Sequence, residues 1–96
     1  MEDVDALFDK AILTLGWKNQ VDKTIEECAE LIQVLAKRGK EAILSQEARM
    51  AVVDEVADVE IMCAQLKKIY WMGDLVEERK KYKLGRLNKR LEEHNG

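Results

Sequence analysis

Two acidic clusters give the chain its clearest chemical feature. They read Glu26-Glu27-Cys28-Ala29-Glu30 and, 25 residues after Glu30, Glu55-Val56-Ala57-Asp58. Within each cluster, carboxylates three residues apart leave the same face of a helix, where like charges repel. Two such pairs among apolar residues indicate a shared ligand that needs several oxygen donors. A divalent cation meets that need, with Mg²⁺ expected and Mn²⁺ as the alternative.

The acidic residues have two other interpretations. Either cluster alone is more simply a solvated helix face, and only their joint occurrence favours a metal site. A di-iron carboxylate bundle requires Glu-x-x-His on two helices. The single histidine is His94, close to the C-terminus, so a di-iron site is a poor fit.

The elements that must position the carboxylates are helices. The 96 residues predict one domain spanning 1–96, and the composition, which is 47% hydrophobic and lacks proline, favours an all-α fold. Apolar spacing predicts helices at about 4–15, from 18 or 19 to 38, 46–71 and 74–93, with a helical turn over 42–44. We expect Asp3, Ser45 and Asp74 to cap helix starts. Gly85 interrupts the pattern of the last helix.

Each of the three longer helices carries an apolar stripe that we expect to face the core. In the predicted helix that ends at 38, the stripe is Val21, Ile25, Cys28, Leu31 or Ile32 and Leu35. In the next helix it is Val52, Val56, Val59, Cys63, Leu66 and Ile69 or Tyr70. In the last helix it is Leu84, Leu87 and Leu91. The two cysteines lack metal-ligand spacing, which predicts buried, reduced thiols.

A short loop should make the two central helices antiparallel. Counting outward from the loop centre near residue 42, Glu30 and Glu55 lie about 12 and 13 residues away, so at ~1.5 Å per residue they reach similar heights. The predicted architecture is a four-helix bundle with two long antiparallel central helices. Because so small a domain builds a limited core, we expect oligomerisation to complete it.

Charge is unevenly distributed along the chain. Residues 1–75 carry nine basic and fifteen acidic side chains, a net −6, whereas residues 76–96 carry seven basic and four acidic ones, a net +3. An acidic body with a basic last helix does not favour nucleic-acid binding, but it suits a metal site beside a phosphate-bearing small molecule. No signal peptide or membrane span is expected, which predicts a cytoplasmic protein without a membrane partner.

The spacing Glu26-Glu27-x-x-Glu30 and Glu55-x-x-Asp58 resembles the signature of the MazG-like nucleotide pyrophosphohydrolases, in the all-α NTP pyrophosphatase superfamily. The surroundings extend the likeness over about residues 16–91. Gln20 and Lys23 precede the motif at familiar spacing. The stretch 57–62 resembles the small phage and prophage branch, and 83–86 resembles the family's basic final helix.

The resemblance implies hydrolysis of a nucleoside triphosphate to a monophosphate and pyrophosphate by a homodimer or homotetramer. It implies Mg²⁺ ligation by the residues Glu27, Glu30, Glu55 and Asp58. Glu26 would bind a further metal or orient a water, and Glu26 or Glu27 would help to deprotonate that water. The phosphates would be met by basic positions of the last helix, Lys83 and Arg86, with Asn88 and Arg90 as further candidates.

Aromatic residues and the remaining motif positions supply candidates for substrate contacts. Trp17 would stack on a nucleobase or pack at a helix junction, and Gln20 and Lys23 complete the expected substrate-binding set. Tyr70 and Trp71 are better explained as core or interface residues. A different class of function also fits: a non-catalytic helical oligomerisation or adaptor module, in which the carboxylates form interhelical salt bridges.

Overall fold

A computed structural model describes residues 3–95 as helices joined by short links. The elements are α1 (Val4–Leu15), α2 (Trp17–Arg38), the 3₁₀ turn η1 (Glu41–Ile43), α3 (Gln46–Ile69) and α4 (Gly73–Asn95). No strand occurs among these residues, so the all-α prediction is confirmed. The helix α2 begins one or two residues earlier than predicted, η1 one residue earlier, and α3 ends two residues earlier.

Two of the three predicted N-caps are confirmed. The Asp3 side chain accepts hydrogen bonds from the backbone N–H groups of Asp5 (2.9 Å) and Ala6 (3.5 Å). The Ser45 hydroxyl accepts one from the N–H of Ala48 at 3.2 Å. The prediction for Asp74 is wrong, because α4 already includes Gly73 and Asp74 lies inside its first turn.

Gly85 does not interrupt α4. The helix is continuous through this position, and an added Cβ would meet no atom within 4 Å. The sixteen other residues between Glu77 and Glu93 have ordinary helix propensities, so a single glycine costs too little to break the helix.

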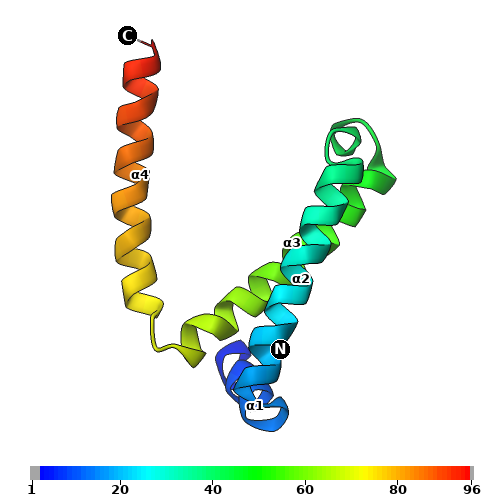
Figure 1. The fold of residues 1–96 in the computed structure, drawn as a ribbon, viewed down its shortest axis with the longest axis vertical. Helices are drawn as coiled ribbons and strands as arrows, with labels where there is room; N and C mark the ends of the chain where they lie inside the picture. The colour runs from blue at the N-terminus through cyan, green and yellow to red at the C-terminus, as the bar shows by residue number, and fades with distance from the viewer. Residues whose placement is uncertain (1–2, 96) are drawn as a thin grey trace.

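The antiparallel pair α2–α3 forms the body of the molecule (Figure 1). Its interior contains an unusual share of polar groups. The Gln20 Nε2 donates to Gln65 Oε1 at 2.7 Å across the two helices, and the Thr24 hydroxyl donates to the Gln20 carbonyl oxygen at 2.8 Å. All three side chains are buried, so hydrogen bonding as well as apolar packing joins α2 to α3.

The first helix packs against the start of α2 and the end of α3 (Figure 1). A pair of ionic contacts fixes it there, because Lys68 Nζ lies 2.7 Å from Asp5 Oδ1 and 2.9 Å from Asp9 Oδ1. Hydrogen bonds to Asp5 and then to Asp9 raise the pKa of Lys68, which keeps that amine charged.

The last helix diverges from the α2–α3 pair as a separate arm (Figure 1). It contacts α3 near its own start, where Lys67 Nζ lies 3.9 Å from Glu77 Oε2, and none of its described residues is buried. The link between the two helices contains Trp71 at φ 48°, a left-handed conformation that bulky side chains rarely adopt. Within a single chain, α4 therefore does not complete a four-helix bundle.

Most of the large apolar side chains in the described residues are exposed, including Ile25, Ile32 and Leu35 of the predicted α2 stripe. Among the described residues only Ala48 and Met62 are buried apolar ones, whereas Val56 and Cys63, predicted on the buried face of α3, are exposed. The α4 stripe of Leu84, Leu87 and Leu91 is exposed too. None of the described helices has the length and apolar character to cross a membrane.

Candidate metal centre

The α2–α3 pair brings the two acidic clusters together. Oxygens of Glu27, Glu55 and Asp58 lie within 4.8 Å of one another, and so do oxygens of Glu26, Glu27 and Glu30. Glu27 belongs to both groups. The structure thus has the predicted antiparallel register, with Glu30 and Glu55 at similar heights.

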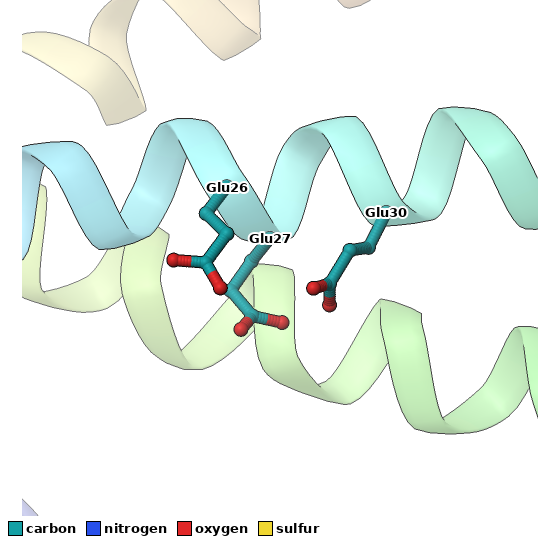
Figure 2. A group of neighbouring side chains, drawn as sticks. All are labelled: Glu26, Glu27 and Glu30. Atoms are coloured by element: carbon teal, nitrogen blue, oxygen red, sulfur yellow. The ribbon is translucent and has the colours of Figure 1, made fainter.

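Helix periodicity explains why these carboxylates meet. Glu27 lies seven residues after Gln20, two turns along the face of α2 that packs on α3. Figure 2 shows Glu26, Glu27 and Glu30 on one side of α2, with the Glu27 and Glu30 side chains directed toward α3. On α3, Glu55 and Asp58 occupy one face at i and i+3.

Burial sets one member of this cluster, Glu27, apart from a solvated acidic side chain. Glu27 is 6% exposed, and only its Oε1 has a partner, Lys23 Nζ at 3.2 Å. The second oxygen, Oε2, is buried without a hydrogen-bond partner, as is Oε2 of Glu55. An unpaired buried carboxylate oxygen is costly. Two of them, one in each half of the cluster, fit the oxygen-donor set that a hard divalent cation takes.

The protonation of Glu55 reflects the same crowding. Loss of hydration raises the pKa of Glu55 above its usual value, and the charges of Glu30, Asp58, Glu27 and Asp54 raise it further. Lys23 has the opposite surroundings, because a hydrogen bond to Glu27 and the charge of Glu26 raise its pKa. Lys23 is the cation paired with this cluster among the described residues, and it leaves most of the negative charge uncompensated.

Two of the predicted substrate-binding residues, Gln20 and Trp17, lie outside the carboxylate cluster. Gln20 is occupied inside the helix pair by its hydrogen bond to Gln65. Trp17 is half exposed and lines a hollow of about 720 Å³ with Leu13, Tyr70 and Trp71. Ten residues separate Trp17 from Glu27, about 15 Å along α2, so the hollow lies near the carboxylates without including them.

The basic candidates all lie on the diverging arm. Lys83, Arg86 and Arg90 line a small hollow of about 160 Å³ on α4. Asn88 Nδ2 donates to Glu92 Oε1 at 3.3 Å, and the Arg86 guanidinium lies 5.9 Å from the centre of the Tyr82 ring. None of these α4 side chains joins the acidic groups within the described chain. The expectation that the basic helix of the same chain faces the carboxylates is not met here.

Sequence reasoning missed two structural residues next to the site. Gln65 pairs with Gln20, and Thr24 bonds back to the helix one turn earlier. A signal was available for Gln65, since it is the sole uncharged polar side chain between Val59 and Ile69. A polar side chain inside an apolar stretch calls for a buried partner.

Comparison of the chain with protein-family models, with curated proteins and with solved structures gave no match. The geometry and burial of the carboxylates are therefore the basis for assigning a function.

Proposed function

We propose that the chain is a Mg²⁺-dependent nucleoside triphosphate pyrophosphohydrolase that works as a homo-oligomer. One observation carries the proposal. Two carboxylate groups share Glu27, and the unpaired buried oxygens of Glu27 and Glu55 belong to them. The motif spacing that resembles the MazG-like enzymes supports the same reaction.

The residues that would hold the cation are Glu27, Glu30, Glu55 and Asp58. Bound there, a divalent ion supplies positive charge that binds the triphosphate and polarises it. Mn²⁺ shares the preference for oxygen donors and is the expected substitute.

Side chains of the homo-oligomer then accept the proton and stabilise the leaving group. Glu26 is exposed and adjacent to the buried Glu27, so it is placed to accept a proton from a water molecule. The water oxygen bonds to the α-phosphorus, and the bond from that phosphorus to the bridging oxygen breaks. Lys83 and Arg86 stabilise the charge on the departing pyrophosphate.

The test is hydrolysis of individual NTPs and dNTPs with Mg²⁺, with monophosphate and pyrophosphate both quantified. We expect Glu30→Ala and Asp58→Ala to lower the rate by at least about 100-fold, because even outer partners of metal sites are worth about 10–100-fold. The exposed acid Glu60, outside both carboxylate groups, provides the matched control Glu60→Ala. Wild-type rates in the two cluster variants would reject the site.

A helical oligomerisation or adaptor module is the second candidate, favoured by the exposed apolar surface. Thermal unfolding with and without Mg²⁺ separates the two, since a bound ion raises the melting temperature by linkage. An unchanged melting temperature together with no phosphate release would favour the adaptor.

A further inference from the structure

The stretch 79–91 of α4 is a dense block of like charge. It contains seven basic and no acidic side chains, although the net charge of the whole chain is −3. None of the described residues of α4 is buried, and beyond its start the helix diverges from the acidic α2–α3 pair (Figure 1). Charges separated by more than about 10 Å in salt solution are largely screened from one another. The acidic body therefore leaves most of this positive charge uncompensated.

Four of the basic side chains form one row along the helix. Arg79, Lys83, Arg86 and Arg90 follow one another at steps of four, three and four residues, so they share a face about 16.5 Å long. The guanidinium groups of Arg79 and Arg86 lie 4.7 Å and 5.9 Å from the centre of the Tyr82 ring, which holds both near that face. We call these four residues the basic row.

The other basic side chains extend the charge around the helix. Lys80 and Lys81 follow Arg79 by about 100° and 200°, and Lys89 lies about 100° from Arg90 in the other direction. Among the described residues, Lys80 is the one basic side chain of 79–91 with an ionic partner, Glu77 at 3.4 Å. Positive charge thus surrounds α4, and the basic row is its densest side.

This distribution fits a polyanion on two sides of the helix better than a flat anionic surface. An interfacial membrane helix buries an apolar face and keeps its charges outside it. On α4 the apolar row Leu84, Leu87 and Leu91 is continued by Lys80 at the same spacing, so inserting that face would bury an amine. The major groove of B-form DNA is about 12 Å wide and admits a helix, with a phosphate backbone along each edge.

We propose that α4 binds double-stranded DNA without sequence preference, lying in the major groove with the basic row against one phosphate backbone and Lys81 facing the other. A duplex segment of about 16.5 Å carries about ten phosphates, enough for every basic side chain. The Asn88 amide, which could read a base edge, is bonded to Glu92 at 3.3 Å, so phosphate contacts predominate. The inference goes beyond the proposed function. Because that function uses Lys83 and Arg86 for pyrophosphate, one α4 cannot serve both ligands at once.

Fluorescence anisotropy of a labelled DNA duplex of about 20 base pairs, titrated with the full chain in potassium chloride without Mg²⁺, tests the proposal. We expect log affinity to fall against log salt concentration with a slope of about −4 to −6, because each phosphate contact contributes about −0.9. Arg79→Gln/Lys81→Gln/Lys89→Gln should weaken binding and make the slope shallower by about 3. A wild-type affinity that does not change with salt would overturn the proposal.

The matched control removes the same charge from the body. Lys10→Gln/Lys37→Gln/Lys40→Gln replaces three exposed lysines and should change the slope by less than about 1. An equal loss in this control would overturn the assignment to α4.

Competition identifies the partner. Unlabelled DNA duplex should displace the labelled one, whereas an RNA duplex and vesicles of phosphatidylserine and phosphatidylcholine should displace it less at equal phosphate concentration, because the A-form major groove is too narrow for side chains to read. Either competitor matching DNA would overturn the proposal. NTP hydrolysis by the α4 variant should equal that of wild type, since its three residues lie outside the proposed site. Hydrolysis without DNA binding in the wild type would reject this inference and retain the proposed function.

Discussion

At the scale of single residues, the ionisation of Glu55 makes both stability and metal binding depend on pH. Its pKa is raised because burial removes water from the carboxylate and because Glu30 and Asp58 stand beside it. The folded chain therefore holds this proton at pH values where the unfolded chain has lost it. The stabilisation that Glu55 contributes is fully present below the usual pKa of glutamate. It is lost as the pH rises through the raised pKa of Glu55.

Replacing Glu55 by glutamine should stabilise the metal-free protein at neutral pH. The amide keeps the shape and removes a charge that is repelled there, so Glu55→Gln should melt a few degrees higher than wild type without Mg²⁺. It should also lose most of the Mg²⁺-induced shift. Glu60→Gln on the same helix is the control and should change neither value. A lower melting temperature for Glu55→Gln would contradict the assigned repulsion.

Metal affinity should depend on pH through the same residue. A cation binds the ionised carboxylate, so Mg²⁺ binding releases a proton from Glu55 and weakens as pH falls through its raised pKa. Titration calorimetry in buffers of different ionisation enthalpy would detect that proton. Affinity that stays constant down to the usual glutamate pKa would exclude Glu55 as a ligand.

At the scale of elements, the buried amide pair between α2 and α3 sets their register. The Gln20–Gln65 bond is 2.7 Å long and buried. Gln65→Leu should destabilise the protein by about 1–3 kcal/mol, because it leaves the Gln20 amide unpaired. The double variant Gln20→Leu/Gln65→Leu should recover most of that loss. Urea unfolding of the wild type, Gln65→Leu, Gln20→Leu and the double variant measures the coupling, and additive losses would show that the pair contributes no specific energy.

Most element types and bounds could be predicted from sequence because they depend on local chemistry. Asp3 and Ser45 act within three residues of themselves, and the carboxylate spacing follows from helix periodicity. The Asp74 cap was wrong because the chain from Tyr70 to Met72 turns through a left-handed Trp71, which no local pattern indicated. The helix starts at Gly73, two residues earlier than a cap at Asp74 allows.

Burial could not be predicted in the same way. The stripes on α3 and α4 have the spacing of core residues, yet Val56, Cys63 and Leu84 are exposed. Spacing identifies which side chains share a face, but it does not identify what covers that face. For the same reason, the spacing of Lys83 and Arg86 on the last helix did not indicate that this helix diverges from the carboxylates.

At the scale of the whole molecule, stability should depend on protein concentration. If the proposed homo-oligomer covers the exposed apolar side chains, dilution exposes them again, and the melting temperature should rise with concentration. Ile32→Glu, at a 67% exposed position of α2, should convert the oligomer to monomers in sedimentation velocity. The matched change Ile43→Glu, at an 86% exposed position in η1, should not. A monomeric wild type at micromolar concentration would contradict the proposed homo-oligomer.

The left-handed residue between α3 and α4 has a mechanical consequence. With 23 residues, α4 is about 35 Å long, so turning it by 20° at Trp71 displaces its far end by about 12 Å. The positions of Lys83 and Arg86 relative to the α2–α3 pair therefore depend on the backbone conformation at Trp71. Trp71→Gly, which frees that angle, would broaden the directions in which the arm points while leaving every charge on it unchanged.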